Sequence, residues 1–169
     1  QFRKGKNQDM IIRAFARHIK NCNDVESHLY LPGNGELLQV MKNLAMDLGI
    51  AERVSFPGFS SKQEVLQMYL NCNVGIVSSD SETFGQSIVE PFVLGRCVVS
   101  THVGIADDIL VDGENGFFFS SEESLAEVLD KLYDNVRLCI DAGNVNYGKR
   151  HLFSWYNVTD RYVQLIRSL

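Results

Sequence analysis

The chain has 169 residues, of which 45% are hydrophobic and 22% are charged, and its formal net charge is −5 at pH 7. These values are close to the averages of soluble globular domains, so they argue against a disordered chain and against a membrane-spanning protein. The acidic balance also argues against a nucleic-acid partner, because phosphate backbones are neutralised by clustered Lys and Arg. The four cysteines and four histidines are widely spaced, so we expect reduced thiols, a cytoplasmic location and no metal site.

Segments with helical periodicity alternate with short apolar segments that are typical of strands. The expected helices span residues 7–21, 35–49, 61–72, 87–94, 107–110, 121–135 and 159–169. The expected strands span residues 26–31, 53–58, 73–79, 97–101 and 113–120, the last of them at a sheet edge. Two helix ends carry local signals: Gly49 can close its helix in the left-handed conformation, and Ser61 with Glu64 fits a capping box.

Strands that alternate with long helices are joined by crossovers, and such connections return the chain to a parallel neighbour. We therefore expect an α/β fold with a Rossmann-like, doubly wound parallel sheet. A doubly wound half normally opens with a strand, whereas the first element expected here is a helix a few residues after Gln1. Residues 1–169 are accordingly expected to form one domain that lacks its first strand, as a fragment of a longer protein.

Gly33 and Gly35 lie between an expected strand and an expected helix, at the edge of the sheet where ligands bind in doubly wound folds. Their spacing matches the start of a dinucleotide-binding fingerprint, but Leu38 occupies the position of the third glycine, which disfavours NAD. Two interpretations stay open. The glycines form a tight turn, or they let the backbone approach a ligand that a side chain would exclude.

Glu82 and Glu90 flank the expected start of a helix. The amides of Phe84 to Ser87 would lie at this helix N-terminus, where free N–H groups and the helix dipole can hold a phosphate. Glu90 would lie about one turn inside the helix, so the two carboxylates would flank the phosphate and bind hydroxyl groups on its two sides. A glycosidase is less favoured, because its two carboxylates must converge on one sugar. Alternatively, Glu82 and Glu90 are solvated surface residues that bind no ligand.

A cluster of basic residues, Arg3, Lys4 and Lys6, precedes the first expected helix. It either faces the same anion or is simply solvated.

The stretch "SSDSETFGQSIVEPFVLGRCVV", with Glu82 and Glu90 in an E-x7-E arrangement, resembles the signature of retaining glycosyltransferases of family 4, the glycosyl transferases group 1. Lys6-Asn7, "LPGNGELL", "RVSFPGF" and "VGIADDILVDGENGFFF" resemble further segments of this family in the same order. The resemblance covers nearly the whole chain. It implies the C-terminal, donor-binding half of a GT-B fold.

The resemblance also implies roles for individual residues. The substrate would be a nucleotide diphosphate sugar such as a UDP- or GDP-hexose, with Glu82 as the catalytic residue at the sugar, Glu90 at the ribose and Lys6 at the pyrophosphate. No metal or other cofactor would be needed. The remaining donor-binding positions that it implies are Gly33, Gly35, Phe56, Pro57, Gly58, Phe84, Gly85, Gln86 and Ser87.

Some positions depart from the family pattern. The arginine expected shortly before the lysine is missing, so Arg3 is a candidate substitute at the phosphate, and Asp108 replaces the usual glutamate. The acceptor, a glycan or lipid-linked glycan, would bind an N-terminal domain, and the full-length enzyme could associate peripherally with the inner face of a membrane. Two alternatives stay open: a nucleotide-sugar epimerase of the same fold, and a non-catalytic interaction module.

Overall fold

Short parallel strands form two separate sheets in the computed structural model, which describes residues 1–168. The first sheet pairs β1 (Leu29–Tyr30) with β2 (Val54–Ser55). The second sheet has the order β3-β4-β5 and contains β3 (Val74–Val77), β4 (Cys97–Ser100) and β5 (Gly116–Phe118). The predicted parallel arrangement is confirmed, and β5 is an edge strand as expected.

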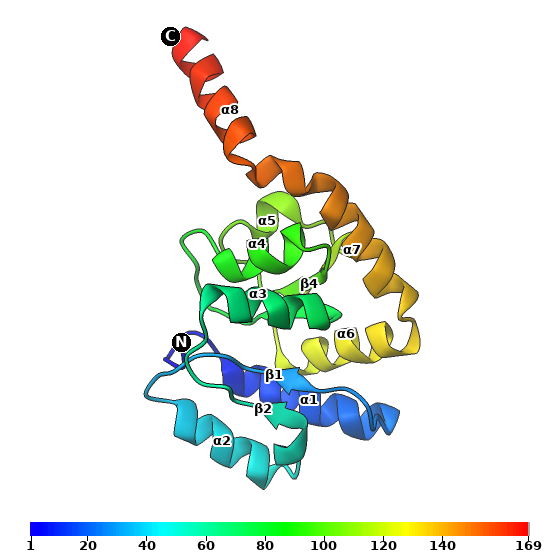
Figure 1. Cartoon of the computed structure of the whole chain (residues 1–169). Helices are drawn as coiled ribbons and strands as arrows, with labels where there is room; N and C mark the ends of the chain where they lie inside the picture. Colours follow the sequence, from blue (N-terminus) through cyan, green and yellow to red (C-terminus); the bar gives the residue numbers. More distant parts are fainter. Residues whose placement is uncertain (169) are drawn as a thin grey trace.

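Helices connect and cover these strands (Figure 1). They are α1 (Gln8–Cys22), α2 (Leu38–Asp47), α3 (Lys62–Asn71), α4 (Gln86–Val93), α5 (Ala106–Ile109), α6 (Glu122–Asp134), α7 (Arg137–Lys149) and α8 (Trp155–Ser168). Helix α1 packs against α2 and α6, α4 packs against β3, β4 and α7, and α8 extends away from the rest of the protein (Figure 1). Within residues 1–168, no helix combines the length and the hydrophobicity that crossing a bilayer requires.

The expected helix ends have the expected geometry. Gly49 has φ 71°, and its N–H donates to the Met46 carbonyl at 2.9 Å, so the chain leaves α2 in the left-handed conformation. At the start of α3, the Ser61 hydroxyl accepts from the Glu64 N–H, and the Glu64 carboxylate accepts from the Ser61 N–H at 2.7 Å. The capping box is therefore confirmed.

The central strand β4 shows that both faces of the second sheet are covered. All four of its residues are buried. Cys97 and Val99 belong to the core shared with α1, α2 and α6, whereas Val98 belongs to a second core shared with α4 and α5. Since neighbouring side chains of a strand point to opposite faces, this division shows that the sheet is doubly wound.

Helix α7 departs from the expectations, which placed no helix over residues 137–149. Its sequence contains two glycines and two asparagines, which are poor helix formers. Tertiary contacts stabilise it instead: Gly143 lies so close to Gly95 that a Cβ would overlap the backbone, and the buried Asn146 amide donates to the Arg96 and Asn115 carbonyls at 2.8 Å. The C-terminal helix also begins earlier than expected, at Trp155.

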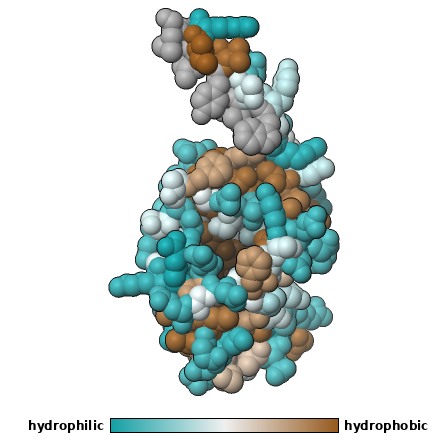
Figure 2. Space-filling view, turned by 60° about the vertical axis from the view of Figure 1, so that its left-hand side comes forward, coloured by the Kyte–Doolittle hydropathy of each residue, from teal (hydrophilic) through white to brown (hydrophobic). Residues whose placement is uncertain are grey.

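A cavity of about 1100 Å³ lies between the two sheets. It is lined by β1 and β3 and by apolar side chains of α1, α3 and α6, among them Ile11, Phe15, Val65, Met68, Leu129 and Leu132. Figure 2 shows the molecule hollowed near its middle, with hydrophobic atoms on the floor of the hollow. In the part of the chain that the structure describes, β1 pairs only with β2 and β3 only with β4, so the strand edges beside the cavity carry no partner.

Candidate functional site

Lys6 and Glu82 meet where the carboxyl end of β3 opens into the cavity, although 76 positions separate them. The Nζ atom of Lys6 lies 2.5 Å from Oε1 of Glu82, which also accepts a hydrogen bond of 2.8 Å from Ser79 Oγ. Burial opposes ionisation of Glu82, but the hydrogen bonds from Lys6 and Ser79 and the nearby charge of Arg3 outweigh it and lower the pKa of this carboxyl. Glu82 is therefore an anion at neutral pH.

Backbone contacts hold the segment before α1 against the loop after β3. The Asp80 N–H donates to the Gly5 carbonyl at 2.9 Å, and the Ser78 hydroxyl donates to the carbonyls of Lys6 and Asn7 at 2.7 and 3.0 Å. The Asn7 side-chain amide donates back to the Ser78 carbonyl at 3.0 Å. Gly5 and Asn7 both have positive φ, a conformation that glycine and asparagine tolerate best. The position of Lys6 is thus fixed by its neighbours on both sides.

The start of α4 presents backbone amides at the same place. Gly85 precedes the helix with φ 95°, and the first helical hydrogen bonds run from the N–H groups of Ile88 and Val89 to the Gly85 carbonyl. The N–H groups of Gln86 and Ser87 therefore have no partner inside the helix. Ser87 lines the cavity. This end of α4 favours an anion, because both free amides and the helix dipole attract negative charge.

Glu90 lies one turn further along α4 and also lines the cavity. Burial raises its pKa, and the positive charge of Lys62 only partly opposes this effect. The neighbouring Tyr69 phenol donates to the Ser87 carbonyl at 3.4 Å, and burial together with Glu90 raises the pKa of this phenol. Glu90 is a poorly solvated carboxylate, so hydrogen-bond donors from a ligand would stabilise it.

The predicted glycine loops lie on the other side of the cavity mouth. The Gly33 N–H donates to the Gly58 carbonyl at 2.6 Å, which joins the loop after β1 to the loop after β2. Gly33 lines the cavity, as does Phe59, a residue that is 82% exposed. Phe56, Pro57 and Gly58 stand next to this position but are not among the lining residues.

Gly35 does not line the cavity. A Cβ at this position would overlap the backbone of Phe2, whose N–H donates to the Asn34 carbonyl at 3.0 Å. Glycine is therefore needed at position 35 because the backbone of Phe2 passes too close for a side chain.

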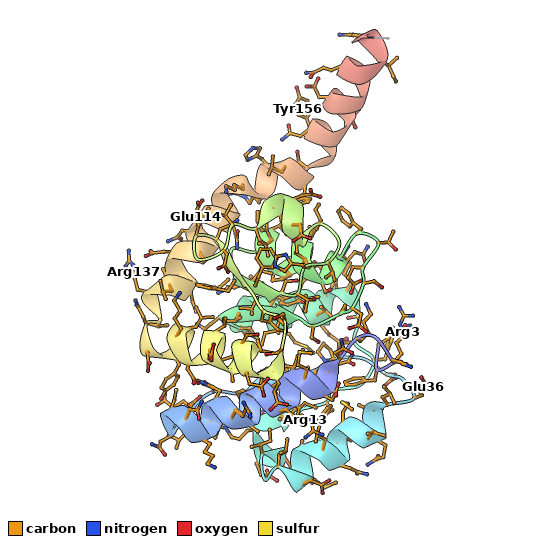
Figure 3. All side chains as sticks on the ribbon, turned by 180° about the vertical axis from the view of Figure 1, so that it is seen from behind. Arg3, Arg13, Glu36, Glu114, Arg137 and Tyr156 are labelled. Carbon is orange, nitrogen blue, oxygen red and sulfur yellow. The ribbon has the colours of Figure 1, made fainter. Side chains whose placement is uncertain are left out.

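Arg3 is exposed and lies outside the cavity. It borders a second depression of about 360 Å³ together with Lys4 and Arg13. Figure 3 shows Arg3 near Glu36 at the end of the N-terminal loop, pointing away from the body of the protein. Its charge reaches the site only through space, by lowering the pKa of Glu82.

The family model of the glycosyl transferases group 1 matches residues 1–148. The chain belongs to this family. The D-inositol 3-phosphate glycosyltransferase of Stackebrandtia nassauensis is 30% identical to this group 1 domain in an alignment 166 residues long that covers 92% of the chain and 37% of the relative. The lipopolysaccharide core biosynthesis glycosyltransferase LpsE of Rhizobium meliloti is 31% identical in an alignment 147 residues long that covers 83% of the chain and 42% of the relative. The group 1 domain thus spans less than half the length of these relatives.

Solved structures share the fold of the group 1 domain. Anabaena HepE in complex with UDP matches 100% of the chain and 47% of its own length, with a TM-score of 0.89 at 21% identity. The complex of HepE with UDP-glucose matches with a TM-score of 0.86 at 22% identity. The predicted family and the predicted GT-B fold class are confirmed, and neither comparison supports the epimerase alternative.

Two residues that shape the site in the group 1 domain, Thr101 and Gly104, were not predicted as site residues from the sequence. Thr101 Oγ1 donates to the Ser79 carbonyl at 2.7 Å, which supports the residue that holds Glu82. Gly104 has φ 53°, and a Cβ there would lie 2.6 Å from the Phe84 carbonyl oxygen and 3.0 Å from the Glu82 Cβ. The available signal was the position of Thr101 and Gly104 at and just beyond the end of the expected strand 97–101, where ligand-binding loops of doubly wound sheets begin.

Proposed function

We propose that this chain is the donor-binding half of a retaining glycosyltransferase, which binds a nucleotide diphosphate sugar and, in the full-length enzyme, transfers the sugar to an acceptor with retained anomeric configuration. The observation that carries the proposal is the joint placement of Lys6, Glu82 and Glu90 around the amide-rich start of α4. One cation, two carboxylates and free amides at one cavity mouth match a ligand with a diphosphate between two polyols.

In the proposed complex the diphosphate lies at the N-terminus of α4, near the amides of Gln86 and Ser87. Lys6 exchanges its hydrogen bond with Glu82 for one with the diphosphate, so that the Glu82 carboxylate accepts hydroxyl groups of the sugar. Glu90 accepts the ribose hydroxyls. As the bond to the sugar breaks, negative charge builds on the departing diphosphate, where the amides, the helix dipole and Lys6 stabilise it. These groups supply the positive charge without a metal ion.

The base would lie at the opposite side of the mouth, near Gly33 and the backbone of Phe56 to Gly58. UDP is the first nucleotide to test, because HepE was solved with UDP and with UDP-glucose. GDP-hexoses are the second class.

The acceptor, a glycan or lipid-linked glycan, is proposed to bind an N-terminal domain. The chain spans 37% and 42% of two relatives, which leaves room for such a domain in a longer protein. The unpartnered edges of β1 and β3 support a further parallel strand between them, which would give the order β2-β1-new strand-β3-β4-β5. Peripheral membrane association and a cytoplasmic location are part of the same proposal; the first is supported by the lipopolysaccharide relative and the second by the free cysteines.

Calorimetry on the full-length protein tests the donor assignment. Glu90→Ala is expected to lower the affinities for UDP and UDP-hexose about 10-fold or more, because both ligands lose the charge-assisted contacts of their ribose. Glu82→Ala is expected to spare UDP and to weaken only the UDP-hexose. Glu127→Ala, an exposed acid on α6, is the matched control and should change neither affinity.

Two outcomes contradict the assignment. An equal loss of UDP and UDP-hexose affinity in Glu82→Ala would remove the proposed division of roles. Absence of binding heat with every UDP and GDP ligand, in a protein whose circular dichroism shows it folded, would remove donor binding altogether.

A further inference from the structure

A cluster of His18, Cys22 and Asp130 lies outside the proposed donor site. His18 and Cys22 are spaced i, i+4 on α1, so they share one face of the helix, and Asp130 comes from the adjacent α6. The Nδ1 atom of His18 lies 2.7 Å and the Sγ atom of Cys22 3.4 Å from Oδ1 of Asp130. His18 lies ten residues after Gln8, which places it ~15 Å along α1 from the end next to Lys6.

The spacing of the donor atoms is close to that of a tetrahedral zinc site. The three donor atoms lie within 4.8 Å of one another. With Zn–N and Zn–O bonds of about 2.0–2.1 Å and a Zn–S bond of about 2.3 Å, tetrahedral ligand atoms are separated by about 3.3–3.6 Å. The Sγ to Oδ1 distance of 3.4 Å already fits, and the Nδ1 to Oδ1 distance of 2.7 Å needs to open by about 0.6 Å on metal binding.

The surroundings of His18 also favour a cation. Its side chain is only 4% exposed, and both ring nitrogens face carboxylate oxygens: Nδ1 faces Asp130, and Nε2 lies 3.2 Å from Oδ2 of Asp24. A neutral imidazole carries one N–H and can satisfy only one of these carboxylates. A metal ion between His18 and Asp130 would satisfy the second, while the Nε2–H would still donate to Asp24.

The candidate ligands are oriented by neighbouring groups, as metal ligands commonly are. The second oxygen of Asp130 accepts from the Asn21 side chain at 2.8 Å. Asp24 is fixed by the N–H groups of Glu26 and Ser27, at 2.8 and 3.0 Å. A metal ion bound to His18 Nδ1 would complete a carboxylate–histidine–metal series with Asp24.

We propose that His18 Nδ1, Cys22 Sγ and Asp130 Oδ1 bind one divalent transition-metal ion, with Zn²⁺ the best match to a nitrogen, sulfur and oxygen donor set. A water molecule completes the tetrahedron. Binding releases the thiol proton of Cys22, and His18 coordinates as the neutral imidazole with its proton on Nε2. The ion links α1 to α6, so its role is structural, and it is independent of the proposed donor site.

Cobalt is the spectroscopic probe for this site. The full chain is reduced, freed of metal with a chelator, and titrated with Co²⁺, which in a site with a thiolate ligand gives a sulfur-to-metal absorption band in the near ultraviolet. The band should saturate at one ion per chain and disappear on addition of Zn²⁺. Zn²⁺ at 100 times its Kd should raise the Tm by about 5 °C or more.

Variants decide whether the three residues bind the metal. Cys22→Ser should abolish the near-ultraviolet band, whereas Cys72→Ser, which changes another free and half-buried thiol, should keep it. Asp130→Asn keeps the thiol and should weaken Co²⁺ at least 10-fold. UDP affinity should not respond to the metal.

The proposal is overturned if the reduced chain gives no band and no Tm shift, since the contacts of His18 with Asp130 and Asp24 are then hydrogen bonds only. An identical response of Cys22→Ser and the parent chain would overturn it as well. Circular dichroism confirms folding of each variant, and the Asp130→Asn titration decides the matter if Cys22→Ser fails to fold.

Discussion

Gly104→Ala should disturb the loop that carries Glu82. The alanine Cβ would lie 2.6 Å from the Phe84 carbonyl oxygen, and this distance is 0.8 Å smaller than the 3.4 Å at which ordinary van der Waals contact begins. It would also lie 3.0 Å from the Glu82 Cβ. The Phe84 carbonyl cannot retreat freely, because it accepts a hydrogen bond of 2.9 Å from the Ile105 N–H.

The magnitude follows from two separate costs. The φ of 53° puts alanine in the left-handed region, at a cost of about 1–2 kcal/mol. Overpacking against the loop adds about 1–3 kcal/mol, so the free energy of unfolding should fall by about 2–5 kcal/mol. The Glu82 Cβ, at 3.0 Å, would also have to move by about 0.4 Å, and the resulting shift of its carboxylate should weaken UDP-hexose binding about 10-fold.

Gly113→Ala is the matched control. Gly113 has φ 76°, but its Cβ would meet no atom within 4 Å, so this variant should lose only about 1–2 kcal/mol and no affinity. Urea denaturation measures the stability of both variants, and calorimetry measures their affinity for UDP and UDP-hexose. If Gly104→Ala lost no more stability than Gly113→Ala and bound UDP-hexose like the parent chain, the close packing of Gly104 on this loop would be refuted.

Three further variants test the charges and the buried polar contacts. Lys6→Met should lower the free energy of unfolding by about 1 kcal/mol at pH 7 and the affinity for UDP about 10-fold. Folding lowers the pKa of Glu82, so its ion pair with Lys6 stabilises the fold at pH values above the unfolded pKa. This stability is lost as the pH falls through the folded pKa. The loss of unfolding free energy in Lys6→Met should therefore become smaller in acid. Glu90→Gln should weaken UDP about 10-fold yet raise the Tm near neutral pH. Burial raises the pKa of Glu90, so this carboxyl stabilises the fold below its unfolded pKa and loses that stability as the pH rises through the folded value; the gain in Tm should vanish below about pH 4. Asn146→Ala should lower the free energy of unfolding in urea by about 2–4 kcal/mol without changing UDP affinity, because the carbonyls of Arg96 and Asn115 lose the Asn146 amide and the Asn115 amide loses one of its two acceptors. A loss below about 1 kcal/mol would contradict this prediction.

Local sequence patterns predicted the structure correctly where a few neighbouring residues determine the backbone geometry. Gly49 and the pair Ser61–Glu64 end and start helices as expected, since these effects act within one turn. Periodicity also identified the parallel α/β fold. Helix α7 could not be found in this way, because its poor helix formers are held by contacts with Gly95 and Asn115, which are distant in sequence.

The same distinction applies to the candidate site. The position of Glu82 and Glu90 around a helix start was evident from the sequence. The ion pair of Lys6 with Glu82 was not, because no spacing rule brings residues 76 positions apart to 2.5 Å. The burial that raises the pKa of Glu90 and the close approach of Gly104 likewise depend on the packed structure. The cluster of His18, Cys22 and Asp130 could not be predicted from the sequence. His18 and Cys22 lie on α1, but Asp130 lies on α6, more than 100 positions away.

The first residues of the chain cross from one half-sheet to the other. Phe2 is hydrogen-bonded to the turn that follows β1, and Gly5 to Asn7 are hydrogen-bonded to the loop that follows β3. This short segment therefore joins the two sheets at the mouth of the cavity, and α1, which follows it, packs against α6. An insertion between Phe2 and Gly5 would therefore change the position of Lys6 relative to the Gly33 turn without altering either residue.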